Sequence, residues 1–335
     1  MEMSLDEFLE EWNNSSPYVH VQTSGSTGVP KPMMVEKRRM LASARITCDF
    51  LGLKLGDSAL LCMSLDYIAG KMMVVRSLER GLKLITVEPS GHPLRGLVQT
   101  TTGPSYSEGE SWEIDFAAMV PMQVYNSLQV PEEKERLMAI RHLIIGGGAI
   151  DEAMEAELRS FPHAVWSTYG MTETLSHIAL RRLSGPEASD WYTPFPSVNV
   201  GITDEGCLVV DAPEVCAERL VTNDIAELSD GCFRVLGRKD NVICSGGIKI
   251  QIEQVECELK PFLRVPYLIS KRPDAKFGEV AVLLTEDSTD EARALCEAHL
   301  KKYYQPKDYI HVDKIPLTET GKPARKLAEN LVKMR

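Results

Sequence analysis

Short apolar runs alternate with segments of helical periodicity over the first two hundred or so residues. Strands are predicted at 58–65, 82–88, 143–148 and 164–168, and helices at about 36–50, 70–80, 132–142 and 151–160. The helix at 36–50 places Met40, Ala44 and Cys48 on one face. Because this alternation is typical of parallel βαβ units, the sequence predicts an α/β core.

After about residue 200 the pattern changes to short strands and turns, followed by the polar, Gly-rich segment GRKDNVICSGG at 237–247. Beyond it, Ile252, Val255 and Leu259 have helical spacing, and predicted strands at 279–285 and 308–314 flank a helix at 288–303. We therefore predict a large N-terminal α/β domain with mixed sheets over residues 1–238 and a small α+β domain over residues 239–335.

Length, charge and cysteine spacing exclude several classes of protein. The 335 residues exceed one typical domain. With 37 Lys and Arg against 48 Asp and Glu, the net charge of −11 argues against a nucleic-acid or anionic-membrane binder. The eight cysteines are scattered without a C-x-x-C pair, which argues against a zinc site and a disulfide scaffold. Because the N-terminus is acidic and no apolar run reaches membrane-spanning length, we expect a cytoplasmic protein without a membrane span.

Residues 23–31, TSGSTGVPK, form the first candidate site. Glycines let backbone N–H groups converge on one anion, and the hydroxyls and Lys31 add donors and charge. Gly25 and Gly28 are too close together for a Walker A loop, and no Ser or Thr follows Lys31. The alternatives are a different kind of phosphate loop and an ordinary surface loop, and Pro30-Lys31 favours the phosphate loop.

Three further segments could carry chemistry. YGMTET at 169–174 follows a predicted strand and offers an aromatic ring, a hydroxyl and the carboxylate of Glu173, which is able to hold Mg²⁺. GGGA at 146–149 leaves another strand and would admit a planar ring. Asp224 and Arg238 could bind a ribose, and PLTETGKPAR at 316–325 presents Lys322. Taken singly, each fits an ordinary turn or tail.

Taken together and in this order, these motifs resemble the adenylate-forming superfamily of acyl-CoA synthetases, adenylation domains and luciferases, from Thr23 to Arg325. The resemblance implies that ATP, Mg²⁺ and CoA bind. Tyr169 would stack on adenine, Thr172 would touch the α-phosphate and Glu173 would ligate Mg²⁺. Asp224 and Arg238 would bind the ribose, and Lys322 would be the catalytic lysine. The other residues it assigns to ATP are Thr23, Ser24, Gly25, Ser26, Thr27, Gly28, Lys31, Gly147, Gly148 and Gly170.

The resemblance also implies a mobile C-terminal domain. Asp240 matches the hinge, about which the small domain swings between an adenylating and a thioester-forming pose. The second pose would bring Gly246, Gly247 and Lys249 to the site for CoA, although Lys249 also fits a solvated surface lysine. Because only 22 residues precede the phosphate loop, we expect a chain shortened at its N-terminus or one that replaces the missing surface by forming a homodimer.

The acid to be activated is the most open question. Tyr67 occupies the position at which the resemblance places an aromatic or histidine gate residue. His177 either lines the acyl pocket or is an ordinary core histidine. Lys71 and Arg76 lie five residues apart in a mostly apolar stretch, either as surface charges or as partners of a second substrate carboxylate. The second option favours a dicarboxylic acid.

Within the superfamily, the length and residues 70–81 are most similar to the o-succinylbenzoate–CoA ligases of menaquinone biosynthesis. The alternatives are another acyl- or aryl-CoA ligase, an adenylation domain that loads a carrier protein, and a non-catalytic nucleotide binder. The presence of Glu173, Asp224, Arg238 and Lys322 speaks against the last of these.

Overall fold

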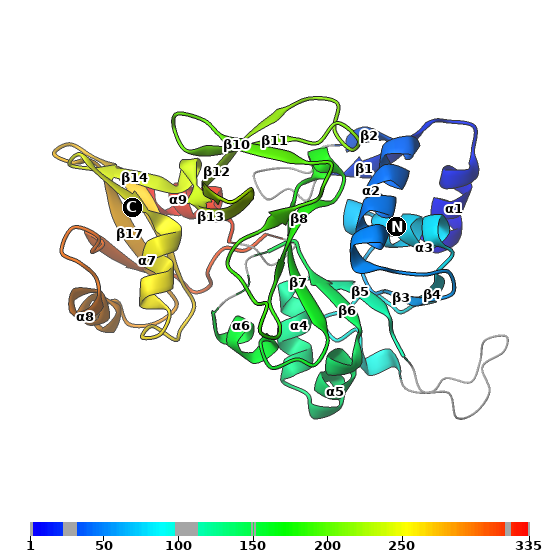
Figure 1. The fold of residues 1–335 in the computed structure, drawn as a ribbon. Coiled ribbons are helices and arrows are strands. Elements are labelled where there is room, and N and C mark those ends of the chain that lie inside the picture. Colours follow the sequence, from blue (N-terminus) through cyan, green and yellow to red (C-terminus); the bar gives the residue numbers. More distant parts are fainter. Residues whose placement is uncertain are drawn as a thin grey trace.

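A computed structural model describes residues 3–22, 32–97, 113–148, 150, 152–318 and 323–333 of the chain. Figure 1 shows the C-terminal strands and helices gathered at one side of the molecule, apart from a larger body built on a seven-stranded sheet. A four-stranded antiparallel sheet lies between them in the chain. The α/β class with mixed sheets, predicted from the sequence, is confirmed by this architecture.

The seven-stranded sheet has the strand order β4-β3-β5-β6-β7-β8-β9. Its parallel strands are β3 (Ser58–Leu61), β4 (Lys83–Thr86), β5 (Phe116–Met119), β6 (His142–Ile145) and β7 (Ala164–Gly170). The helices between and beside them are α1 (Leu5–Asn13), α2 (Lys37–Leu51), α3 (Ile68–Arg80), α4 (Pro121–Leu128), α5 (Pro131–Ala139) and α6 (Glu152–Leu158). Such crossovers bring the carboxyl ends of the parallel strands to one edge of the sheet.

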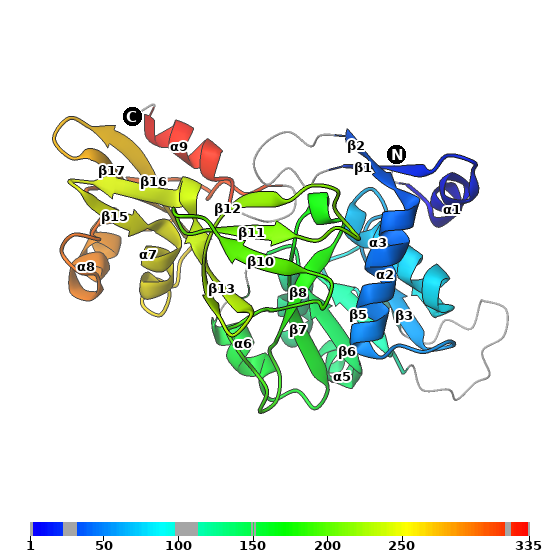
Figure 2. The same cartoon turned by 45° about the horizontal axis from the view of Figure 1, so that its top comes forward.

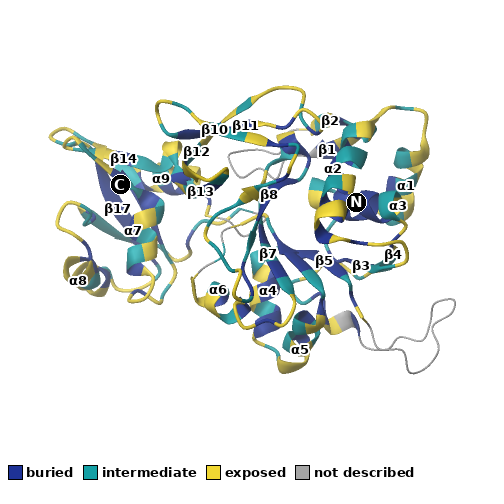
Figure 3. Ribbon diagram, viewed as in Figure 1, coloured by how far each residue is buried: buried dark blue, intermediate teal, exposed yellow. Residues whose placement is uncertain are grey.

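Both faces of this sheet are covered, because successive strand residues point to opposite sides. In β3, Ala59 and Leu61 join the core beneath α1, α2 and α3, whereas Leu60 joins the core beneath α4, α5 and α6. Met40, Ala44 and Cys48 of α2 are fully buried, as the sequence predicts. Figure 3 shows the buried residues concentrated in the central strands.

The end of this sheet departs from the parallel βαβ pattern of its other strands. β8 (His177–Arg182) and β9 (Thr193–Pro194) run antiparallel to their neighbours. β7 also continues to Gly170, so Tyr169 and Gly170 lie in the strand and not in the loop predicted to follow it. The reversal between β7 and β8 is tight: a Cβ atom on Gly170 would lie 2.2 Å from the Ser176 carbonyl oxygen. Only glycine allows this close approach.

The four-stranded sheet consists of β10 (Asn199–Ile202), β11 (Cys207–Asp211), β12 (Leu220–Ser229) and β13 (Cys232–Arg238). A separate hairpin joins β1 (Tyr18–Gln22) to β2 (Pro32–Glu36). The C-terminal sheet is formed by β14 (Val242–Ser245), β15 (Ile248–Gln251), β16 (Tyr267–Asp274), β17 (Gly278–Thr285) and β18 (Asp308–His311). The helices α7 (Ile252–Leu259), α8 (Thr289–His299) and α9 (Arg325–Lys333) accompany this sheet, as Figure 2 shows from a second direction.

The buried apolar residues form four clusters. The members of two clusters all lie between residues 8 and 233, and the members of the other two all lie between residues 243 and 332. A short 3₁₀ turn at Lys239–Asn241 joins the two regions. The domain boundary at 238/239 and the mobility of the C-terminal region remain predictions. Within the described ranges, no helix is long and apolar enough to span a bilayer.

Candidate active site

A cavity of about 1030 Å³ opens at the carboxyl edge of the parallel strands, where α/β proteins bind their ligands. Residues at or just beyond the ends of β3, β5, β6 and β7 line it, together with residues of α3 and the segment 314–318. Of the sequence-predicted site residues, the lining includes Tyr67, Arg76, Gly147, Gly170, Thr172 and His177. The structure therefore gathers substrate and nucleotide candidates around one cavity.

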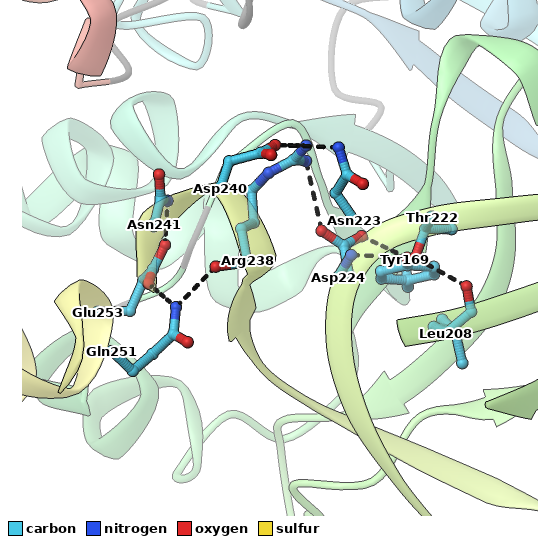
Figure 4. Close-up of polar contacts among 10 residues, drawn as sticks. All are labelled: Tyr169, Leu208, Thr222, Asn223, Asp224, Arg238, Asp240, Asn241, Gln251 and Glu253. Atoms are coloured by element: carbon cyan, nitrogen blue, oxygen red, sulfur yellow. Dashed lines mark hydrogen bonds and ion pairs between the residues drawn. The ribbon is translucent and has the colours of Figure 1, made fainter. Parts of the chain in front are cut away.

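The ribose candidates Asp224 and Arg238 lie opposite each other on β12 and β13, 14 residues apart in the chain (Figure 4). Arg238 Nη1 donates to Asp224 Oδ1 at 3.3 Å, and the hydroxyl of Tyr169 donates to Asp224 Oδ2 at 2.5 Å. Burial first, and then the Asp224 carboxylate, raise the pKa of Tyr169, so its hydroxyl stays a donor. The three side chains form one group that can accept from and donate to sugar hydroxyls.

The predicted phosphate and metal contacts follow β7. Thr172 begins a 3₁₀ turn and lines the cavity, whereas Glu173 is exposed beside it. The buried Thr174 stabilises the turn, because its hydroxyl accepts from Met171 N at 3.1 Å. Leu175 has φ of 66°, a strained conformation of the kind found at functional sites. One exposed carboxylate suits Mg²⁺, which keeps several ligands from water and substrate phosphates.

Arg76 is the most unusual residue of the cavity wall, because it is 2% exposed and has no ion-pair partner in the described parts of the chain. Its Nη2 donates to Ser176 Oγ at 2.7 Å, and its Nε has no hydrogen-bond partner among the described residues. Burial lowers the pKa of Arg76 to about 10, so the side chain remains charged at neutral pH. A buried cation without a counterion is costly and favours an anionic ligand.

Lys71, the other candidate for a substrate carboxylate, faces away from the cavity. Its Nζ lies 3.8 Å from Glu11 Oε2 and 3.2 Å from the sulfur of Met3, and it covers the ring of Phe8 at 5.3 Å. These partners belong to or precede α1. Five helical residues correspond to about 140° of rotation, so Lys71 and Arg76 point to different sides of α3. Lys71 thus anchors α1, and of these two cations Arg76 is the one that lines the cavity.

Replacing Glu11 with alanine is expected to lower the free energy of unfolding by about 1–3 kcal/mol at neutral pH, because Lys71 would be buried without its counterion. Burial raises the pKa of Glu11, but the hydrogen bonds from His20 and the charge of Lys71 outweigh it, and the pKa is lowered. The difference from wild type should therefore shrink as the pH falls through this lowered pKa.

Denaturant unfolding of Glu11→Ala at several pH values measures this effect. Glu10→Ala is the matched control, because the exposed Glu10 is on the same helix. An equal loss of stability in both variants would contradict the role of the buried pair.

The predicted hinge residue Asp240 lies in the 3₁₀ turn after β13. Its Oδ2 accepts from Asn223 Nδ2 at 3.0 Å and from Arg238 Nη2 at 3.3 Å (Figure 4). On the other side of the turn, Gln251 Nε2 donates to the carbonyl of Arg238 at 3.0 Å. The hinge candidate is therefore linked by hydrogen bonds to the ribose-binding candidates.

The residues predicted for CoA form a hairpin away from the cavity. Gly246 and Gly247, with φ of 58° and 85°, make the two-residue turn between β14 and β15, and Lys249 is exposed on β15. None of the three lines the cavity in this structure. Gly148, next to the lining residue Gly147, is exposed and also lies outside the lining.

Two predicted segments lie outside the described residues. Thr23, Ser24, Gly25, Ser26, Thr27, Gly28 and Lys31 fall between β1, which ends at Gln22, and β2, which begins at Pro32. Lys322 also lies outside them, but the segment before it reaches the cavity: Thr318 lines the wall, and Leu317 pairs with Pro323.

Three residues at or beside the cavity went unnoticed in the sequence. Ser176 was next to a named candidate, His177, and its position alone could have suggested it. Thr47 lies 130 residues from its partner His177 and carries no sequence signal. Lys314 lines the cavity from the C-terminal region and adds a second cation there.

Known proteins resemble this chain over almost its full length. The profile of a family described as AMP-binding enzyme matches residues 5–216, more than half of the chain. The chain belongs to the AMP-binding enzymes. The predicted membership of the adenylate-forming superfamily is thereby confirmed.

Individual AMP-binding enzymes extend the comparison. A 2-succinylbenzoate–CoA ligase of Listeria monocytogenes (serotype 4b, strain F2365) is 27% identical over 95% of this chain and 70% of its own. An acyl-CoA synthetase (AMP-forming)/AMP-acid ligase II-like protein from Dyadobacter fermentans is 32% identical, with a TM-score of 0.64, over 98% of this chain and 93% of its own. The o-succinylbenzoate–CoA synthetase of Bacillus subtilis, solved with ATP and magnesium, shares the fold at 23% identity, with a TM-score of 0.74 over 92% of this chain and 68% of its own.

Proposed function

We propose that the protein is a cytoplasmic, ATP-dependent acid–CoA ligase that acts in two steps. A substrate carboxylate attacks the α-phosphorus of ATP, which forms an acyl-adenylate and releases pyrophosphate. The thiol of CoA then attacks the acyl carbon, and AMP leaves as the thioester forms. Family membership and the similarity to 2-succinylbenzoate–CoA ligases over 95% of the chain support this activity.

The nucleotide would bind beside the cavity. Asp224 would accept from the ribose hydroxyls while Arg238 donates, and the hydroxyl of Tyr169 would keep the Asp224 carboxylate in place. The Thr172 hydroxyl would donate to the α-phosphate from the cavity wall. Mg²⁺, held by Glu173 and the phosphates, would neutralise the charge that develops on the leaving pyrophosphate. No protein nucleophile is required, since positioning and electrostatics carry the reaction.

The single observation that supports the choice of acid is the buried Arg76, which has no counterion among the described residues and lies in an otherwise mostly apolar wall. A second carboxylate on the substrate would supply the missing counterion and accept from its free N–H groups. A fatty acid would leave this cation unpaired, at a cost of several kcal/mol. We therefore propose a dicarboxylic acid, specifically o-succinylbenzoate, whose aromatic carboxylate would meet Arg76 while its succinyl carboxylate reacts.

Replacing Arg76 with methionine is expected to weaken use of o-succinylbenzoate by about 2–3 kcal/mol, roughly 30- to 150-fold in KM. Benzoylpropionate has the same skeleton without the ring carboxylate, and its turnover should change little. Pyrophosphate release with and without CoA, for both acids, measures the effect. Equal losses for the two acids would contradict the pairing, and turnover of an unrelated acid alone would contradict the choice of substrate.

We further propose that the C-terminal region turns about Asp240 between the two steps. The segment 314–318 lies against the cavity, whereas the hairpin with Gly246, Gly247 and Lys249 does not line it. This pose suits adenylation, and a second pose would be needed for CoA.

A further inference from the structure

Behind Arg76, a chain of polar side chains runs through the protein interior. Arg76 comes from α3 and Thr47 from α2. His177 is the first residue of β8, and Ser176 directly precedes it. Thr47, His177 and Arg76 are 0%, 6% and 2% exposed. Buried polar groups at this depth are costly unless each donor has an acceptor, so the direction of every hydrogen bond is constrained.

The directions follow from the single proton of each hydroxyl. Thr47 Oγ1 donates to the carbonyl of Ser43 at 3.0 Å, so it must accept from His177 Nε2, 3.1 Å away. Burial, and then the charge of Arg76, lower the pKa of His177, so the ring is neutral and its Nδ1 is an acceptor. Nδ1 accordingly accepts from Ser176 Oγ at 3.1 Å.

With its proton turned toward His177, Ser176 presents only lone pairs to Arg76, whose Nη2 donates to it at 2.7 Å. Arg76 is thus held by a neutral acceptor, and a neutral acceptor leaves its positive charge uncompensated. The close turn at Gly170 keeps Ser176 and His177 at this position, since a Cβ atom there would lie 2.5 Å from the Cα of His177.

We infer that Thr47, His177 and Ser176 form a relay that orients Arg76 for the second carboxylate of the substrate and so determines the selectivity for diacids. This inference rests on the proposed function. Thr47 and His177 are positioning residues: they act through Ser176 and Arg76. Without the relay, the Ser176 proton is free to point at the guanidinium, and Arg76 loses its defined orientation.

Paired substitutions test the relay. Thr47→Val removes the acceptor for His177 Nε2, whereas Thr47→Ser keeps it. His177→Asn keeps an acceptor near the position of Nδ1, whereas His177→Gln keeps only a donor toward Thr47. Thr285→Val is the matched control, because Thr285 is fully buried in the C-terminal sheet and its hydroxyl accepts from Asp287 N.

Three measurements are compared for every variant: kcat and KM for o-succinylbenzoate and for benzoylpropionate, the Kd of each acid by calorimetry, and Tm. Thr47→Val and His177→Gln should lower the diacid-to-monoacid ratio of kcat/KM about tenfold, chiefly through KM. Thr47→Ser and His177→Asn should retain most of the ratio, and Thr285→Val should lower Tm alone.

The relay would be overturned if Thr47→Val and His177→Gln kept the ratio within about twofold of wild type while Arg76→Met abolished it. Equal loss of the ratio in both members of each pair would also overturn it. If Arg76→Met itself left the ratio unchanged, the proposed diacid substrate would be wrong instead, so the two failures are distinguishable.

Discussion

Replacing Lys322 with alanine is expected to abolish adenylate formation while leaving thioester formation from a supplied acyl-adenylate nearly intact. Two anions must meet in the first step, the substrate carboxylate and the α-phosphate, and a lysine between them would neutralise the charge that develops. Loss of one such electrostatic contact typically costs about 10²–10³-fold in rate. The second step needs no cation at this place, because a neutral thioester forms and AMP departs.

The neighbourhood of Lys322 supports this expectation. Thr318, four residues before it, lines the cavity, and Leu317 forms a bridge with Pro323, which follows it directly. Both ends of the segment that carries Lys322 therefore lie beside the site.

Lys314 is the rival cation, since it lines the cavity from the same region. Lys314→Ala is accordingly the control, and both variants are assayed by pyrophosphate–ATP isotope exchange and by CoA-dependent use of the purified acyl-adenylate. Normal exchange in Lys322→Ala, with loss in Lys314→Ala, would transfer the catalytic role to Lys314.

The strand and helix pattern predicted β3, β4, β6 and β7 of the large sheet, because each of these strands is a recognisable apolar run, but it missed the short strand β5 between β3 and β6. It did not give β8, whose antiparallel course depends on the tight reversal at Gly170 and the strained Leu175. Those are tertiary features with no periodic signal. The N-terminal helix is a second example of a tertiary feature. Its acidic, amphipathic pattern is visible in the sequence, but its contact with Lys71 is made by Glu11, 60 residues away in the chain.

In the candidate site, too, some residues could be assigned from the sequence and others only from the packed structure. Asp224 and Arg238 were assigned through motif resemblance, and their cross-strand pairing accounts for their spacing. Lys71 and Arg76 could not be separated by composition, although their spacing of five along a helix already implied different directions. The burial of Arg76, without a counterion in the described parts of the chain, could be seen only once α3, β7 and β8 were packed together, because burial is a property of the assembled core.

Locking the C-terminal region in its present pose is expected to preserve adenylate formation and eliminate thioester formation. The two regions touch where α7 meets α6: Cys257 Sγ donates to Glu152 Oε1 at 3.3 Å. Burial, and then the Glu152 carboxylate, raise the pKa of Cys257, and Glu152→Cys removes that carboxylate. A short bifunctional methanethiosulfonate should then join the introduced cysteine to Cys257.

The exposed Cys244 is replaced by serine in every variant, so that the reagent does not attack the predicted CoA hairpin. Linked protein should exchange pyrophosphate at the rate of unlinked protein but make no CoA thioester, and a reductant should restore the second step. The control carries Glu152→Cys with Cys257→Ser and cannot be linked. Thioester formation at full rate in the linked protein would mean that CoA reaches the adenylate without rotation about Asp240. In that case the hairpin with Gly246, Gly247 and Lys249 would have no route to the cavity, and the CoA site would have to be sought among the residues that already line it.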